Sequence, residues 1–240
     1  MAPHVGRCSK CYNISMKLFL SGGGGTQDSK ELDLKFLASI DTSKPVLYIP
    51  IAINATKHPY PSCLEWIQGV FQPLGFNNFT LWGEAELSTK TLEDFKQFSG
   101  VYIGGGNTFK LLKELREFGT LDILIKLVEQ NIPIYGGSAG ALIQAKSIIT
   151  AEPHDTNDVN LTNLRALNFL HDSYLWVHYT SAEDEIIQKY ITDYSLEKNI
   201  AIAEDGGLFI SEKGIEVIGP ASAFIFDGSG KREVRPGNLI

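Results

Sequence analysis

Short apolar runs alternate with amphipathic stretches along most of this chain, and that order restricts the folds open to it. The apolar runs are typical of buried β-strands. The stretches between them carry apolar residues three and four positions apart, as helices with one buried face do. An alternation of strands and helices favours a mainly parallel sheet covered by helices on both faces. We therefore predict an α/β fold.

The pattern locates the elements of this fold. Seven apolar runs are predicted as strands: Lys17–Leu20, Pro45–Ile49, Asn78–Leu81, Val101–Ile103, Ile132–Tyr135, Leu175–Val177 and Ile200–Ala203. Five stretches are predicted as helices: Leu32–Ile40, Cys63–Leu74, Phe109–Phe118, Leu121–Val128 and Ile186–Tyr194. Near the C-terminus, short runs separated by glycine turns predict an antiparallel meander attached to the same sheet, over Leu208–Ile210, Ile215–Ile218 and Ala223–Phe226.

Neither a repeat nor a linker divides the 240 residues, so we predict one domain over residues 16–240. Residues 1–15 lack the apolar core of a secretory signal and precede the first predicted strand. We interpret them as an N-terminal extension or leader.

Composition excludes several classes of partner. A net charge of −7 without a dense Lys/Arg cluster argues against nucleic-acid binding. No apolar run approaches the roughly 20 residues of a membrane span. The three cysteines, Cys8, Cys11 and Cys63, provide no even disulfide framework, which favours a reducing compartment, the cytoplasm. Cys8 and Cys11 form a C-x-x-C without a second ligand pair, so we expect no metal site.

The stretch Gly136-Gly137-Ser138-Ala139-Gly140 follows a predicted strand and precedes the apolar run Ala141-Leu142-Ile143. Glycines beside a serine permit the strained strand-to-helix turn that exposes a nucleophilic hydroxyl. A tight connection in which Ser138 only caps a helix explains the same residues. The pentapeptide alone does not decide between these interpretations.

Two other glycine-rich turns follow predicted strands, Gly22–Gly25 and Gly104-Gly105-Gly106. Loops at the carboxyl ends of parallel strands converge on one crevice, so all three turns can line one site. Neither turn has the spacing of a nucleotide-binding motif. An oxyanion hole with N–H donors from Ala139 and Gly106 is the preferred interpretation, and close backbone packing is the alternative.

A serine nucleophile needs a base, and His178 ends the run Leu175-Trp176-Val177, which places it at a strand's carboxyl end, on the same rim of the sheet as Ser138. His154 and His171 lie in polar stretches and are interpreted as surface residues. Glu204 follows the next predicted strand and is assigned to orient the imidazole, with Asp158 as the second candidate. A simple β-turn also explains Glu204-Asp205-Gly206-Gly207.

In this order the motifs resemble those of the dipeptidase E and cyanophycinase group of serine peptidases, whose fold is similar to that of class I glutamine amidotransferases. Gly104-Gly105-Gly106-Asn107-Thr108-Phe109 resembles the family's G-G-G-N-T-F, Gly136-Gly137-Ser138-Ala139-Gly140-Ala141 resembles its G-x-S-A-G-A, and His178 stands where its catalytic histidine does. The resemblance runs from about Met16 nearly to the C-terminus.

The resemblance implies a serine peptidase that hydrolyses short peptides through an acyl-enzyme, with Ser138 as nucleophile and His178 as base and then acid. It implies donors at Gly106 and Ala139, no metal or organic cofactor, and a homodimer. Aspartyl-specific members carry arginines after the histidine, whereas this chain has Glu183-Asp184-Glu185 there. Acids at that place repel an aspartyl side chain, so strict Asp-X specificity is not expected. The rival hypothesis is a non-catalytic module of the same fold that binds a small anionic ligand.

Overall fold

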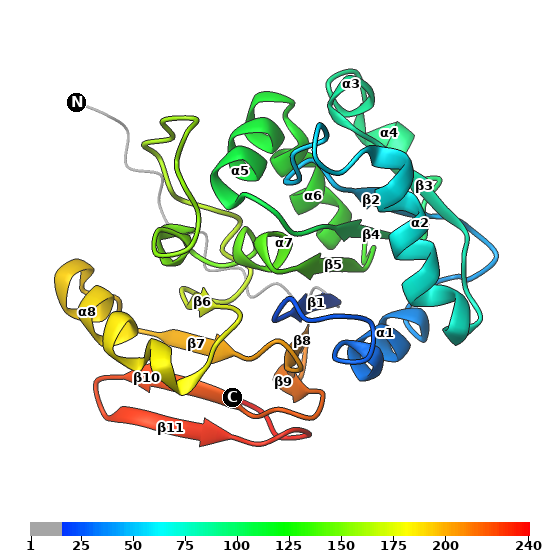
Figure 1. Cartoon of the computed structure of the whole chain (residues 1–240). Helices are drawn as coiled ribbons and strands as arrows, with labels where there is room; N and C mark the ends of the chain where they lie inside the picture. Colours follow the sequence, from blue (N-terminus) through cyan, green and yellow to red (C-terminus); the bar gives the residue numbers. More distant parts are fainter. Residues whose placement is uncertain (1–15) are drawn as a thin grey trace.

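A seven-stranded sheet forms the centre of the protein (Figure 1). The structure is a computed structural model and describes residues 16–240, so the predicted extension, with Cys8 and Cys11, lies outside the described residues. The strand order is β3-β2-β4-β5-β1-β8-β9. The strands are β1 (Leu18–Ser21), β2 (Val46–Ile49), β3 (Phe79–Leu81), β4 (Gly100–Ile103), β5 (Ile134–Gly137), β8 (Gly207–Ser211) and β9 (Gly214–Ile218).

The five strands from β3 to β1 run parallel, and β8 and β9 continue the sheet antiparallel beyond β1. Sequence reasoning predicted β1 to β5 in this parallel arrangement, and the α/β class is confirmed. Strand β5 lies two residues further along the chain than the predicted Ile132–Tyr135. Gly136 and Gly137 have low strand propensity, but they pair with Leu20 and Ser21 of β1 and so extend the strand.

Side chains of successive strand residues point to opposite faces of the sheet, and each face has its own helices. Leu18 and Leu20 belong to the apolar cluster beneath α5 (Thr108–Glu117), α6 (Thr120–Glu129) and α7 (Ala139–Leu142). Phe19 belongs to the cluster beneath α1 (Lys30–Leu37) and α2 (Tyr60–Phe71). Figure 1 shows these two groups of helices on either side of the sheet.

Four short elements have no counterpart in the prediction, because three or four residues are too few to display a helical period. They are the helices α3 (Glu84–Leu87) and α4 (Leu92–Phe95) and the 3₁₀ turns η2 (Ile149–Ala151) and η3 (Ser181–Glu183). A further 3₁₀ turn, η1 (Gln72–Leu74), follows α2 and lies within the predicted helix Cys63–Leu74.

A second, four-stranded sheet corrects the prediction of a single one. Its order is β11-β10-β7-β6, with β6 (Tyr174–Trp176), β7 (Asn199–Ile202), β10 (Ala223–Asp227) and β11 (Gly230–Val234). The expected C-terminal meander is therefore divided, because β8 and β9 join the first sheet while β10 pairs with β7. Periodicity identifies a strand but not its partner, and β11, with four exposed residues of five, has little apolar pattern to detect.

The second sheet packs against the first through one shared apolar cluster. Leu175, Ile200 and Ile225 of this sheet belong to the same cluster as Leu18 and Leu20. The other face of the second sheet is covered by α8 (Asp184–Tyr194), whose Ile187 packs with Trp176 and Phe226. Figure 1 shows α8 and this sheet beside the ends of β1 and β5, so that the loops of the two sheets meet there.

Candidate active site

Ser138 occupies a sharp turn between β5 and α7. Its φ of 49° and ψ of −109° are a strained conformation for a residue with a side chain. The turn is tight because glycines flank it: a Cβ on Gly140 would lie 2.2 Å from the carbonyl oxygen of Ile103, and one on Gly136 would lie 2.2 Å from that of Gly140. The glycine-serine-glycine pattern therefore serves both close packing and an exposed hydroxyl.

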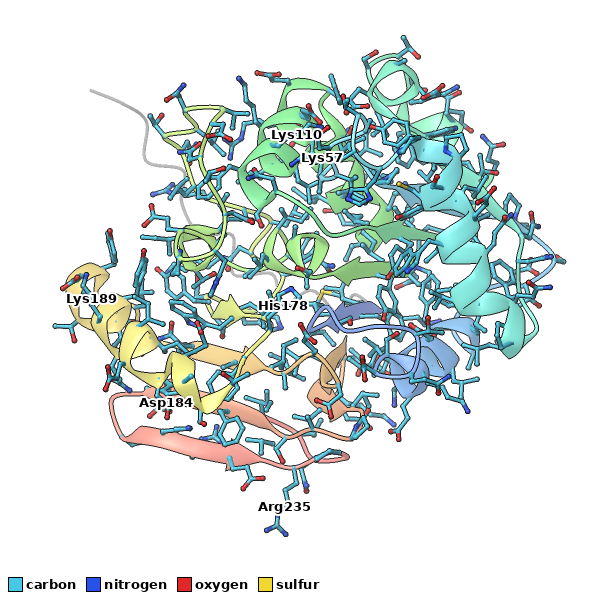
Figure 2. The ribbon with its side chains drawn as sticks, viewed as in Figure 1. Lys57, Lys110, His178, Asp184, Lys189 and Arg235 are labelled. Carbon is cyan, nitrogen blue, oxygen red and sulfur yellow. The ribbon has the colours of Figure 1, made fainter. Side chains whose placement is uncertain are left out.

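His178 comes to Ser138 from the other sheet. It follows β6, has a φ of 54°, and donates its backbone N–H to the carbonyl of Gly22 at 3.0 Å. Its Nε2 lies 2.8 Å from Ser138 Oγ. Figure 2 shows His178 between the second sheet and β1. The predicted meeting of serine and histidine is present, but the reason given for it, a shared rim of one sheet, is wrong.

Glu204 follows β7 and completes a chain of side chains with these two residues. Its Oε1 lies 2.9 Å from Nδ1 of His178, and its backbone carbonyl accepts a hydrogen bond from the N–H of Gly24 at 3.2 Å. The second candidate, Asp158, is exposed and accepts a hydrogen bond from the Thr156 hydroxyl at 2.9 Å. Of the two, the structure brings only Glu204 into hydrogen-bonding contact with His178.

Gly23 is a site residue whose particular role sequence reasoning missed. Its φ is +104°, and a Cβ at this position would lie 2.3 Å from Cε1 of His178 and 3.0 Å from Cβ of Ser138. No side chain fits there without displacing the imidazole. The run of four glycines indicated a site-lining turn, but only the packed structure shows which glycine faces the histidine.

The turn after β4 presents free backbone donors beside Ser138. Gly104 N–H bonds to Ile49 and Asn107 N–H bonds to Ala52, whereas the N–H groups of Gly105 and Gly106 have no acceptor among residues 16–240. Gly106 has a φ of +133°, and a Cβ there would lie 2.4 Å from the carbonyl oxygen of Ala52. The N–H of Ala139, just after the serine, also has no acceptor in the described chain.

Gly105, to which the sequence analysis assigned no role of its own, lies beside the serine. A Cβ built on it would lie 3.2 Å from Ser138 Cβ and 3.7 Å from Ser138 Oγ. The sequence pattern predicted that the whole triglycine turn lines the site, and of its members only Gly106 was assigned a role. Asn107 caps α5, since its Oδ1 accepts the N–H of Lys110 at 2.9 Å.

Two cavities meet at Ser138, and both are lined by Gly23, Gly105 and Gly106. We call the larger, about 750 Å³, the tyrosine cavity, since Tyr48 and Tyr102 line it together with Ile53, Trp66 and Val70. We call the smaller, about 500 Å³, the histidine cavity, since His178 lines it together with Thr108, Leu142, Thr150, His154 and Asp155. His154, interpreted from sequence as a surface residue, is exposed and also borders this cavity.

Beneath the tyrosine cavity lies a buried carboxyl group that sequence reasoning missed. Asp33 of α1 is 1% exposed, and its Oδ2 accepts a hydrogen bond from Ser29, which lines the cavity, at 2.8 Å. Burial raises the pKa of Asp33 to about 6, and the hydrogen bond from Ser29 offsets part of that rise. Helical periodicity places Asp33 beside buried Leu32, but a charged residue type gives no signal of burial.

The acids that follow His178 in sequence do not line either cavity. Asp184 bonds to Lys231 at 2.6 Å and to the hydroxyl of Tyr179 at 2.7 Å, and Figure 2 shows it beside the second sheet, away from His178. Glu183 lies 3.1 Å from His154. Their expected repulsion of an aspartyl substrate therefore has no direct geometric basis in the cavities.

Over residues 16–240, no group of three or more His, Cys, Asp or Glu side chains is placed to hold a metal ion. Within the same range, every helix is too short or too polar to cross a membrane.

Comparison with known proteins gives a family match over most of the chain. The model of Peptidase family S51 matches residues 18–218. An uncharacterized peptidase of Listeria monocytogenes is 31% identical over 182 residues, which cover 73% of this chain and 85% of that protein. Peptidase E of Haemophilus influenzae is 32% identical over 120 residues, half of each chain.

The fold is also found among solved structures. A peptidase from an acI-B1 actinobacterium superposes with a TM-score of 0.67 at 16% identity, over 95% of this chain and 98% of that one. The parallel sheet with its helices and the antiparallel C-terminal part are therefore an arrangement that a solved peptidase shares.

Proposed function

This chain belongs to peptidase family S51, a family of serine-type peptidases, and from that premise we propose that it hydrolyses short peptides with Ser138 as the nucleophile. The observation that carries the proposal is the 2.8 Å contact between Ser138 Oγ and Nε2 of His178. A serine hydroxyl is a weak nucleophile unless a base takes its proton, and this contact supplies the base.

The chemistry follows from the order of contacts. His178 takes the proton as Ser138 Oγ attacks the peptide carbonyl, and it returns that proton to the departing amine. An acyl-enzyme remains, and a water molecule activated by the same imidazole hydrolyses it. Glu204 accepts the Nδ1–H of His178, which keeps Nε2 free to act as the base and stabilises the imidazolium as it forms.

The tetrahedral intermediate carries a negative oxygen that needs hydrogen-bond donors. We assign Ala139 N–H as one donor and Gly106 N–H as the other, with the adjacent Gly105 N–H as the competing candidate for the second place. All three groups lack an acceptor among residues 16–240, so they are available to an oxyanion. Loss of one such donor typically costs about 3 kcal/mol of transition-state stabilisation.

The decisive test compares Ser138→Ala with the unaltered protein on a defined library of short peptides, read by mass spectrometry. We expect turnover to fall by about 10³-fold or more, because the nucleophile is absent. Ser88→Ala is the matched control, since Ser88 is an exposed serine that lines neither cavity.

A fluorophosphonate probe provides the second readout. It should label the unaltered protein and Ser88→Ala, and it should not label Ser138→Ala. Unchanged peptide turnover in Ser138→Ala would exclude the assigned nucleophile. An unlabelled protein without turnover would favour the rival hypothesis, a binding module of this fold.

A further inference from the structure

The two cavities that meet at Ser138 can be assigned to the two halves of a substrate, and this step depends on the proposed function. His178 lines the histidine cavity and does not line the tyrosine cavity. The imidazole that takes the proton of Ser138 must deliver it to the departing nitrogen, so the leaving group lies on the side of His178. The tyrosine cavity is then on the acyl side, where the side chain before the scissile bond is bound.

Most of the exposed surface of the tyrosine cavity is apolar, although polar side chains also line it. Val70 and Tyr102 are buried, whereas Trp66 of α2 is 47% exposed and is among the most exposed large apolar side chains of the described chain. A ligand that covers an exposed indole gains about 25 cal/mol for each Å² of apolar surface removed from water. At about 750 Å³ the cavity has room for a large side chain and its adjoining backbone.

The charges around the cavity do not form a buried site for a carboxylate. Lys110 lines the cavity, but its ammonium lies 2.9 Å from both Glu84 and Glu114 and also donates to the carbonyl of Ile51. Lys57 also lines the cavity, but it is exposed to water and has no carboxylate partner within residues 16–240. Asp158, of opposite charge, is also exposed on the cavity lining. Figure 2 shows both lysines on the same side of His178.

Two phenol groups lie close to the catalytic turns. Tyr48 Oη is 3.3 Å from where a Cβ on Gly104 would lie, and Tyr102 Oη is 3.2 Å from the same position on Gly137. Burial raises the pKa of both phenols, which therefore stay neutral and can donate a hydrogen bond. This combination of apolar walls and neutral donors suits a bulky neutral side chain, including one with a polar tip.

We infer that the tyrosine cavity is an acyl-side subsite for a large aromatic or long apolar side chain, and that Trp66 is its specificity-determining residue. An aspartyl side chain in this cavity would exchange water for mostly apolar walls, and the Lys57 ammonium on the lining is exposed to water, where an ion pair contributes little. A phenylalanyl or tyrosyl side chain would cover Trp66 and fill the space beside Val70.

The test is a series of Xaa-Ala and acetyl-Xaa-Ala peptides in which Xaa is Phe, Tyr, Leu, Ala, Asp or Glu. We expect kcat/KM for the Phe and Tyr peptides to exceed kcat/KM for the Ala peptide by about 100-fold, because the larger side chains bury more apolar area. The excess over the Asp peptide should be larger still. Trp66→Ala should lower kcat/KM for Phe by about 10-fold, mainly through KM, and leave the Ala peptide nearly unchanged. Leu34→Ala, a position that is 46% exposed on α1 and outside both cavities, is the matched control.

The outcomes separate this inference from the function on which it rests. If the fluorophosphonate labels Ser138 but Asp or Glu gives the highest kcat/KM, the subsite assignment is overturned and the peptidase remains. If Trp66→Ala reduces turnover of all peptides equally, Trp66 does not determine specificity. If Ser138 is unlabelled and no peptide is cleaved, the proposed function and the inference fail together.

Discussion

The two sheets of this protein contribute to the candidate site in different ways. The seven-stranded sheet places Ser138 and the free N–H donors through short turns that directly follow its strands. The four-stranded sheet supplies His178 and Glu204, which reach the serine only because the loops of the two sheets are joined. Local sequence is enough to build the turn of the proposed nucleophile, whereas the position of the proposed base depends on tertiary packing.

Three backbone hydrogen bonds join the loop after β1 to loops of the second sheet. Gly22 N–H donates to Gly206, Gly24 N–H donates to Glu204, and His178 N–H donates to Gly22. A Cβ on Gly22 would lie 1.8 Å from the carbonyl oxygen of Ala203, so the two segments approach too closely for any side chain. The glycine run therefore allows close approach between the sheets, and the contact between Ser138 and His178 depends on it.

Gly23→Ala should break the contact between the two sheets' catalytic residues most severely. The added methyl would overlap the imidazole of His178 and force it away from Ser138, so we expect kcat/KM to fall by about 10³-fold. Gly25→Ala is the control, because its Cβ would meet only Asp28 Oδ2, at 3.6 Å. Peptide turnover with thermal unfolding measures both effects, and equal activity of the two variants would contradict the role assigned to Gly23.

Asp33→Asn tests the stability of the part of the protein built on the seven-stranded sheet. The folded protein holds the Asp33 proton more tightly than the unfolded chain does, so stability is lost as pH rises from the ordinary pKa of 3.8 to about 6. Asparagine removes this loss, which corresponds to about 3 kcal/mol at most. We expect the variant's gain in unfolding free energy over the unaltered protein to grow between pH 4 and 7 and then level off.

Urea unfolding at several pH values measures this gain. Asp122→Asn, at an exposed position on α6, is the control. A gain for Asp33→Asn that is the same at pH 4 and pH 7 would show that the Asp33 carboxyl does not titrate in this way.

Glu204→Gln tests the role proposed for the carboxylate that the second sheet supplies. Glutamine can accept the Nδ1–H of His178 but does not stabilise an imidazolium as a carboxylate does, so we expect kcat to fall by about 100-fold. Asp158→Asn, on the tyrosine cavity, should change kcat by less than about 3-fold. Steady-state kinetics on one peptide would decide, and a larger loss in Asp158→Asn would reverse the assignment.

Asn199→Ala tests the framework that carries the base. The buried Asn199 side chain accepts from the Trp176 indole at 3.2 Å and donates to the carbonyl of Leu196 at 2.8 Å. Its removal leaves buried polar groups unpaired, so we expect a loss of about 2 kcal/mol in unfolding free energy. Asn78→Ala, at an exposed site, should lose less than about 0.5 kcal/mol. Similar losses in urea unfolding would show that Asn199 does not hold the second sheet.

The location and the partners of this protein remain predictions. They comprise a cytoplasmic location, a homodimer and the absence of nucleic-acid and membrane partners, and a single domain over residues 16–240 is likewise a prediction. The absence of strict Asp-X specificity also remains a prediction. Its original reason, the acids after His178, is replaced by the apolar lining of the tyrosine cavity.

The sequence by itself determined the α/β class, most strand and helix positions and the turn that carries Ser138, because these depend on periodicity and on glycine at fixed spacing. It also selected His178 and Glu204, through their positions directly after apolar strands. Tertiary structure alone decided that those strands form a separate sheet, that Gly23 faces the imidazole and that Asp33 is buried. Strand pairing and close approach join residues distant in sequence, and no local pattern encodes which partner a strand or glycine will meet.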